Sequence, residues 1–140
     1  MYEETLQILE AKLGAEHQDV ATTLNILAGL YRQMEDHEKA LKLYQRALGI
    51  SEKVLGSQNP SVATTLNDLA ELYRQMGDYE KALPLFQKSL EIREKVLGSQ
   101  NPSVATTLNN LAELYESMEN HEKALKLHQS TGKSSNYPKQ

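Results

Sequence analysis

Apolar residues recur along the chain at the spacing of an α-helix. In residues 62–76, four of them share one helix face at i, i+3, i+4 and i+7, namely Leu66, Leu69, Ala70 and Tyr73. The segment that follows and ends at Gly98 also has a helical pattern. Its predicted core positions are Ala82, Leu83, Phe86, Leu90 and either Val96 or Leu97. A short polar turn separates the two helices, so we expect them to be antiparallel.

This helix pair is one unit of a tandem repeat. The run VATTLN begins at Val20, Val62 and Val104, which makes the unit 42 residues long. Between residues 20–61 and 62–103, 32 of the 42 positions are identical. A fixed period in this range is typical of stacked units that each bury a face against their neighbours. The pattern therefore predicts an all-α array whose binding surface is shared by successive units.

The repeat is incomplete at both ends. Residues 1–19 align without a gap to the second half of a unit, so the chain opens on a second helix that lacks its first. The third copy, residues 104–129, has a predicted turn at Glu119-Asn120 and then a short seventh helix. Residues 130–140 are polar and are expected to be disordered. The sequence thus predicts about seven helices followed by a disordered tail.

Prolines mark two helix starts and one helix interior in the sequence. Asn59-Pro60 and the matching pair at 101–102 mark helix starts, because asparagine caps free amides and proline suits the first helical position. Pro84 lies past the first turn of its predicted helix, where it should remove one backbone hydrogen bond and bend the helix. Its counterparts in the other copies are Lys42 and Lys126, so the fold does not require the bend.

Composition excludes several classes of function. The chain has no cysteine, so disulfides, thiolate metal sites and cysteine nucleophiles are absent. Its net charge is −4, with acids and bases interspersed, which gives no basic stripe for nucleic acid. No apolar stretch approaches the length of a membrane span, and the opening segment is acidic where a signal peptide is basic. We expect a soluble cytoplasmic protein with neither nucleic-acid nor membrane partners.

The sequence offers no constellation for metal binding or catalysis. The four histidines are His17, His37, His121 and His128, and only the last two share a predicted helix, at i and i+7 without a third ligand. No serine is followed by a plausible base, and no glycine-rich phosphate loop occurs. We therefore predict that the protein is not an enzyme and has no cofactor, metal or catalytic residue.

The run LNDLAELYRQMGDYEKALPLFQKSL resembles the tetratricopeptide repeat (TPR). The matching positions are Leu66, Leu69, Ala70, Tyr73, Gly77, Ala82, Phe86 and Ser89. The longer period and the run LEIREKVLGSQNPSVATTLNNLA resemble the subclass found in kinesin light chains and nephrocystin-type proteins. The resemblance covers residues 1 to about 129. It implies a right-handed superhelix of antiparallel helix pairs, and a groove lined by the first helices in which family members commonly bind peptide segments.

The positions expected to face this groove recur at spacings of three and four residues in each first helix. They are Thr22, Asn25, Gly29 and Arg32, then Thr64, Asn67, Glu71 and Arg74, then Thr106, Asn109, Glu113 and Glu116. The asparagines would form a ladder, and because a primary amide both donates and accepts, it can hold the backbone of an extended peptide. The alternative is that each asparagine bonds the neighbouring helix.

Ligand preference is expected at positions that vary between copies. They are the series Ile26, Asp68 and Asn110 and the series Gly29, Glu71 and Glu113. Arg32 and Arg74 give way to Glu116, so the groove is expected to be basic near the N-terminal end and acidic toward the C-terminal end. Such a polarity could orient a charged peptide. The alternative for any single residue is a solvated polar face.

A structural role is the second interpretation of the array. The opening helix is expected to expose apolar residues that are covered inside the array, namely Tyr2, Leu6, Leu9 and Leu13. Uncovered apolar surface is usually paired, and ends that are not self-complementary can stack head to tail into a homo-oligomer. A third interpretation is a sensor fragment of a larger multidomain protein.

Overall fold

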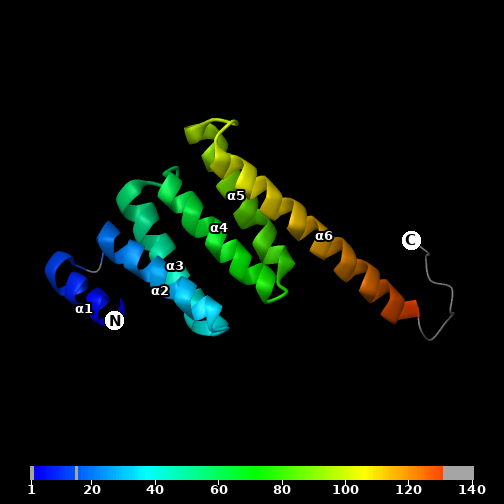
Figure 1. Ribbon diagram of the computed structural model, residues 1–140, viewed down its shortest axis with the longest axis horizontal. Coiled ribbons are helices and arrows are strands. Elements are labelled where there is room, and N and C mark those ends of the chain that lie inside the picture. The colour runs from blue at the N-terminus through cyan, green and yellow to red at the C-terminus, as the bar shows by residue number, and fades with distance from the viewer. Residues whose placement is uncertain (1, 15, 131–140) are drawn as a thin grey trace.

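The computed structural model describes the backbone of residues 2–14 and 16–130 and the side chains of residues 3–14 and 16–119. All regular structure in these residues is helical. The helices are α1 (Tyr2–Leu13), α2 (Gln18–Gln33), α3 (His37–Leu55), α4 (Pro60–Gln75), α5 (Tyr79–Leu97) and α6 (Pro102–Ser130). Each contacts the next, and they form a stack that runs from α1 to α6 (Figure 1). The predicted all-α repeat fold is confirmed.

The helix starts predicted at the asparagine–proline pairs are confirmed. Asn59 Oδ1 accepts a hydrogen bond from the Ser61 backbone N–H at 2.9 Å, and Pro60 is the first residue of α4. The same bond joins Asn101 Oδ1 to the Ser103 N–H at 2.9 Å. In each case the asparagine satisfies an amide that the helix itself leaves free, and the proline contributes no such amide.

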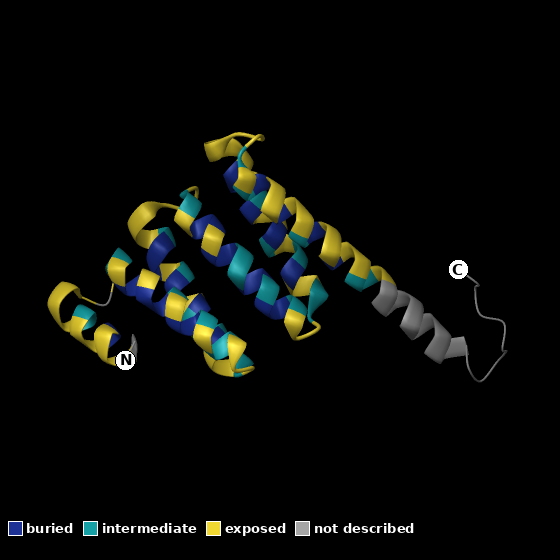
Figure 2. Ribbon diagram, in the orientation of Figure 1, coloured by how far each residue is buried: buried dark blue, intermediate teal, exposed yellow. Residues whose placement is uncertain are grey.

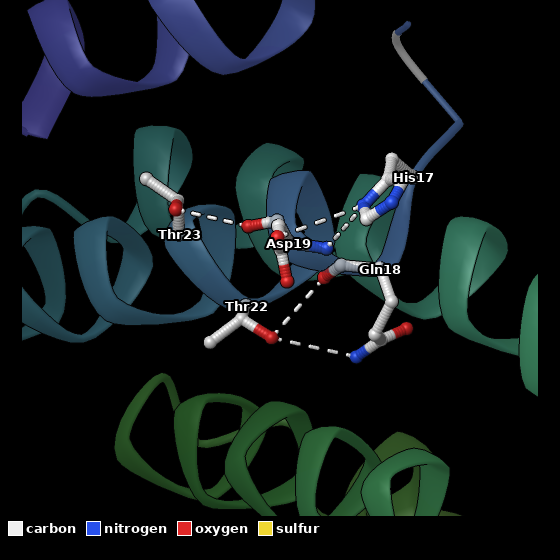
Figure 3. A network of polar contacts seen from close by, with 5 residues as sticks. All are labelled: His17, Gln18, Asp19, Thr22 and Thr23. Atoms are coloured by element: carbon white, nitrogen blue, oxygen red, sulfur yellow. Dashed lines mark hydrogen bonds and ion pairs between the residues drawn. The ribbon is translucent and has the colours of Figure 1, made fainter. Parts of the chain in front are cut away.

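A histidine caps α2 in place of asparagine (Figure 3). His17 Nδ1 accepts a hydrogen bond from the Asp19 N–H at 3.0 Å. An imidazole nitrogen accepts only when it carries no proton, so the neutral side chain performs the capping. In the same turn the hydroxyls of Thr22 and Thr23 donate to the carbonyls of Gln18 and Asp19, at 3.1 and 3.0 Å. His17 therefore serves the local structure of the helix start.

The central first helix, α4, is packed on two sides. It contacts α3 before it and α5 after it. Its buried residues are Val62, Ala63, Thr65, Leu66, Leu69, Ala70, Leu72 and Tyr73. A helix with two apolar sides needs two neighbours, and the stack supplies them. Tyr73, which we predicted to be buried between helices, has 9% of its surface exposed.

The core of the second helices lies one turn earlier than predicted. Val96 and Leu97 are 48% and 38% exposed, so the prediction that one of them joins the core is wrong. Ile92 and Arg93 are buried instead. The reason is length, because α5 has 19 residues and α4 has 16, which leaves the last turn of α5 without a facing partner in α4.

The seventh helix predicted after Glu119-Asn120 is wrong. The structure has no turn at these residues, and α6 continues without a break to Ser130. The described part of the chain therefore contains six helices. We predicted disorder for residues 130–140, but Ser130 is the last residue of α6, and residues 131–140 lie outside the described residues.

Two features explain why α6 continues and does not turn back on itself at residues 119–120. They are the residue at the turn position and the apolar surface that a seventh helix would bury. The two turns that do form each hold one residue at positive φ, Glu35 at 62° and Gly77 at 81°. A glutamate is strained there, and in the first copy the complete burial of Tyr44 offsets that cost. The third copy has Glu119 at the turn and His128 at the aromatic position. A fold-back would combine a strained turn with less apolar burial, so the helix continues.

Candidate functional site

The first helices α2, α4 and α6 form a row in which α4 contacts both of the others. All residues predicted to face the groove lie on these three helices. We call them the first-helix surface: Thr22, Asn25, Gly29, Arg32, Thr64, Asn67, Glu71, Arg74, Thr106, Asn109, Glu113 and Glu116. None of them is fully buried, and those of α6 are all exposed. The surface is therefore polar and open along its length.

The three asparagines of the predicted ladder stand in three different environments. Asn67 Oδ1 accepts a hydrogen bond from Asn110 Nδ2 at 3.1 Å, which joins α4 to α6. This is the alternative in which an asparagine bonds the neighbouring helix. Asn109 is exposed. Asn25 is half-buried, and its Oδ1 is buried without a hydrogen-bond partner. The structure thus brings Asn110, and not Asn109, to Asn67.

The unpartnered oxygen of Asn25 follows from one substitution between copies. Asn67 and Asn110 are 43 residues apart, and the same separation relates Asn25 to Asp68. At the contact between α2 and α4, a carboxyl therefore stands where an amide stands at the contact between α4 and α6. An ionised carboxylate has no proton to donate. It cannot give Asn25 the hydrogen bond that Asn67 receives.

Burial dominates the electrostatics of the contact between α2 and α4. It raises the pKa of the Asp68 carboxyl, while Arg32 and Arg93 act in the opposite direction. Burial likewise raises the pKa of Tyr44 to about 12, with Asp68 adding to the rise. Both groups are disfavoured as anions because little water solvates their charge. Arg32 and Asp68, which the sequence placed at variable groove positions, are thus electrostatic neighbours.

Arg93 is a residue that sequence reasoning missed. It lies on α5, is 8% exposed, and donates to Thr107 Oγ1 at 2.6 Å and to Thr64 Oγ1 at 3.3 Å. Burial lowers the pKa of its guanidinium, and Asp68 opposes that effect. The other copies have Leu9 and Ser51 at this position. The change of residue type between copies was the only signal in the sequence, and it did not reveal that the position is buried.

The charge polarity expected along the row is weaker than predicted. Arg74 is held by Glu71 in a two-pronged ion pair, with Nε to Oε1 at 3.0 Å and Nη2 to Oε2 at 2.7 Å. Arg74 therefore does not add an unbalanced positive charge. Arg32 has glycine three residues before it in place of that glutamate. Arg32 has Asp68 as an electrostatic neighbour but no ion pair like that of Arg74, and the exposed acids of α6 are Glu113 and Glu116.

A cavity of about 390 Å³ lies where the C-terminal ends of α2 and α4 approach each other. It is lined by Arg32, Gln33, Glu35, His37 and Gln75. Nδ1 of His37 is buried and has no hydrogen-bond partner. The cavity therefore combines a guanidinium, two primary amides, an imidazole and the carboxyl group of Glu35 beside the first-helix surface.

The residues predicted for self-association divide between two sides of α1. Leu6 is buried and Leu9 is half-buried, and both pack against α2, so the expectation that they are exposed is wrong. Leu13 is 43% exposed, and the side chain of Tyr2 lies outside the described residues. Ile8, which we did not predict, is 56% exposed. A second helix has two apolar sides, and α2 covers only one of them.

The described residues hold no metal site of the ordinary kind. Within them, no three side chains of histidine, aspartate or glutamate converge as ligands. The side chains of His121 and His128 lie outside this part of the chain. No helix in the described part is both long enough and apolar enough to cross a membrane.

Comparison with known proteins gives consistent matches. A family model described as tetratricopeptide repeat matches residues 1–53, 19–95 and 61–131. The crystal structure of BtubC (BKLC) from P. vanneervenii is similar, with a TM-score of 0.77 and 29% identity over 99% of this chain and 56% of that one. A putative kinesin light chain of Podosopora anserina with nearly identical TPR-like repeats has a TM-score of 0.77 and 26% identity over 90% and 60%. The chain thus spans less than two thirds of either protein. No curated protein matches it.

Proposed function

Because the chain belongs to the tetratricopeptide repeat family, whose repeats are generally non-catalytic scaffolds for protein interaction, we propose that its first-helix surface binds an extended segment of a partner protein. The segment carries an acidic group at the Arg32 end and basic side chains over α6. The proposal concerns the site, since the family alone does not specify a ligand.

The observation that carries this proposal is the cavity at the ends of α2 and α4. Its volume of about 390 Å³ accommodates a side chain or a terminal carboxylate. Arg32 supplies a planar donor fork suited to a carboxylate, and Gln33 and Gln75 supply amide donors beside it. Glu35 also lines the cavity, so the acidic group binds on the Arg32 side, away from that carboxylate. Arg32 is half-buried, so its charge is less screened than that of a fully exposed arginine.

Charge on α6 gives the bound segment a direction. Glu113 and Glu116 are exposed, and neither has an arginine three residues further on like the one that pairs with Glu71. Glu113 also interacts electrostatically with Arg74 of α4, so Glu116 is the less compensated of the two acids. A basic residue of the partner can therefore pair with them. Opposite charges at the two ends of one surface favour one orientation of a charged peptide over the other.

The asparagine ladder contributes less than its regular spacing indicates. The Oδ1 of Asn67 is already bonded to Asn110, and the Oδ1 of Asn25 is buried. A backbone hydrogen bond nets about 0.5 to 1.5 kcal/mol, so the remaining amide groups alone give weak binding. Useful affinity then depends on Arg32 and on the acids of α6.

The test is selection of peptides from a random library, followed by charge reversal. Peptides selected on the native chain should carry an acidic group and basic residues. Arg32→Glu should lower their affinity at least tenfold, and Glu113→Lys with Glu116→Lys should do the same, because each change replaces attraction by repulsion. Fluorescence anisotropy gives the affinities. Glu91→Lys, on the exposed side of α5, is the matched control.

Circular dichroism must show unchanged helicity and melting in every variant. If the selected peptides bind the charge-reversed variants as tightly as the native chain, the first-helix surface is not the binding site.

A further inference from the structure

α6 has exposed residues along one side (Figure 2), and four of them are apolar or aromatic. This side is the counterpart of a side that is buried in α4 and formed by Ala63, Leu66, Ala70 and Tyr73. On α6 the residues 42 positions later are all exposed: Ala105, Leu108, Ala112 and Tyr115. Leu108 is 48% and Tyr115 is 50% exposed. We call these four residues the open side of α6. Its opposite side, which includes Val104 and Leu114, is buried.

Inside the array, a second helix of the same copy covers this side. Ile92 of α5 lies in one apolar cluster with Val62, Ala63 and Leu66 of α4. Ile50 of α3 lies in the equivalent cluster with Val20, Ala21 and Leu24 of α2. In both complete copies, an isoleucine of the second helix thus covers the start of this side. Within the described residues no such helix lies beside α6, because α6 continues straight past its predicted turn.

α1, at the N-terminal end of the array, leaves the complementary surface uncovered. α1 is a second helix, and Ile8 occupies the position of Ile50 and Ile92. Those two isoleucines are 7% and 1% exposed, whereas Ile8 is 56% exposed. Leu6 on the other side of α1 is buried in the cluster that includes α2. α1 therefore exposes the side that a second helix uses to cover its own first helix.

We propose that copies of this chain associate head to tail, with α1 of one copy packed on the open side of α6 of the next. Ile8 then lies against Ala105 and Leu108, as Ile92 lies with Ala63 and Leu66. The contact continues the most extensive helix contacts of the chain, α2 with α3 and α4 with α5. The two surfaces differ, so the association is heterologous and leaves a free surface at each outer end. It goes beyond the proposed peptide binding and does not depend on it.

A pair of positions that carries opposite charges within the array carries two negative charges at this junction. Consecutive second helices within the chain are joined by ion pairs, which are Arg46 with Glu10 and Lys88 with Glu52. At the junction the same two positions are Glu4 of one copy and Glu94 of the other. Two acids repel each other, and salt screens the repulsion. Association of the native chain should therefore strengthen as salt concentration rises.

The first experiment measures mass against concentration by sedimentation equilibrium. The native chain should shift from monomer to dimer and larger species. Ile8→Glu and Leu108→Glu should each raise the apparent Kd at least tenfold, because each places a charge in the apolar contact. Both residues are exposed within the single chain, so neither change should alter helicity. Met34→Glu is the control, since Met34 is 65% exposed and belongs to neither surface.

A mixture of the two variants decides the geometry. The Leu108→Glu chain keeps an intact α1, and the Ile8→Glu chain keeps an intact open side of α6. Mixed one to one, they should form a dimer that stops growing, although each alone is monomeric. Pairing of like surfaces gives a different result, because one of the two variants would then still associate by itself. That result would overturn the proposal.

The charge at the junction gives an independent check. Glu4→Lys should strengthen association several-fold at low salt and should reverse its salt dependence, because it restores the pairing seen for Lys88 and Glu52. A native chain that stays monomeric at every concentration and salt condition would refute the proposal.

Discussion

At the scale of single residues, the repeated units act as internal controls for one another. Asn67 receives a hydrogen bond from Asn110, whereas the Oδ1 of Asn25 is buried without a partner, and Asp68 stands at the sequence position that corresponds to Asn110. Most of the surrounding sequence is the same in both copies. The change from the amide of Asn110 to the carboxyl of Asp68 is the difference between the two contacts that bears on this hydrogen bond, because only the amide has a proton to donate at pH 7.

Replacing this carboxyl should stabilise the fold. Asp68→Asn supplies an amide donor at the position equivalent to Asn110, from which Asn67 Oδ1 receives its hydrogen bond, and it removes a half-buried acid. An unsatisfied buried polar group costs about 1 to 3 kcal/mol, so we expect the free energy of unfolding at pH 7 to rise by about 1 kcal/mol or more. Urea denaturation measures it. Glu91→Gln, at an exposed position of α5, should change stability by less than about 0.5 kcal/mol.

The same substitution should also change the pH dependence of stability. Burial raises the pKa of Asp68 in the folded state above its ordinary value of 3.8, so the folded chain holds the proton more tightly than the unfolded chain. The resulting stability is complete below pH 3.8 and is lost as pH rises through the folded pKa. Asp68→Asn should remove this loss. Parallel stability curves for the native chain and the variant would contradict the assignment.

The asparagines show that a repeat pattern does not predict which side chains meet between successive units. Their spacing predicts a ladder of equivalent positions, but the bond that forms joins position 67 to position 110 and not to 109. Which side chains meet depends on the rotation between successive units, a property of the packed stack. The helix faces were predictable from period alone, and the partners across units were not.

At the scale of elements, α5 tolerates a proline in its interior. Pro84 is exposed, and α5 has 19 residues, the same length as α3, in which Lys42 occupies the equivalent position. The proline does not shorten α5. Its effect is confined to the backbone hydrogen bond that it cannot donate and to the clash of its ring with the preceding turn of the helix. Both lower the stability of a helix interior.

Pro84→Lys should therefore raise the free energy of unfolding by about 3 kcal/mol, the typical penalty for proline inside a helix. The reciprocal change, Lys42→Pro, should lower it by a similar amount. Thermal and urea denaturation of both variants give the two values. If neither substitution shifts stability by more than about 0.5 kcal/mol, the second helices absorb the proline by a local adjustment.

Helix starts were more predictable than the end of α6, and the reason is physical. A start such as Asn59-Pro60 is encoded by neighbouring residues, since the cap and the amide that it satisfies are two positions apart. Whether a helix folds back depends on what the next segment can bury. Glu35 and Glu119 occupy the same turn position, yet only the first lies in a turn. That difference comes from packing partners distant in sequence.

At the scale of the whole molecule, the array behaves as a stack in which helices contact only near neighbours. Residues at equivalent positions then contribute according to whether a neighbour covers them. The position of Tyr73 shows this most clearly. It is 9% exposed in the middle of the stack, whereas Tyr115, one copy later, is 50% exposed.

The two tyrosines should therefore respond differently to truncation. Tyr73→Ala should cost about 3 to 5 kcal/mol of unfolding free energy, as for other large buried side chains. Tyr115→Ala should cost about 0.5 kcal/mol or less in dilute solution, because an exposed side chain loses little packing. Equal costs for the two in dilute solution would show that α6 is covered within the single chain.

Protein concentration separates the fold of one chain from the association of several. If α1 of a second copy packs on the open side of α6, Leu108 becomes buried as concentration rises, and association adds to stability by mass action. The melting temperature of the native chain should then increase with concentration, and that of Leu108→Ala should increase less. Tyr73→Ala leaves both outer surfaces intact and should retain the native dependence. A concentration dependence identical in all three chains would place the contact elsewhere, because of the two substituted residues only Leu108 lies in the proposed contact.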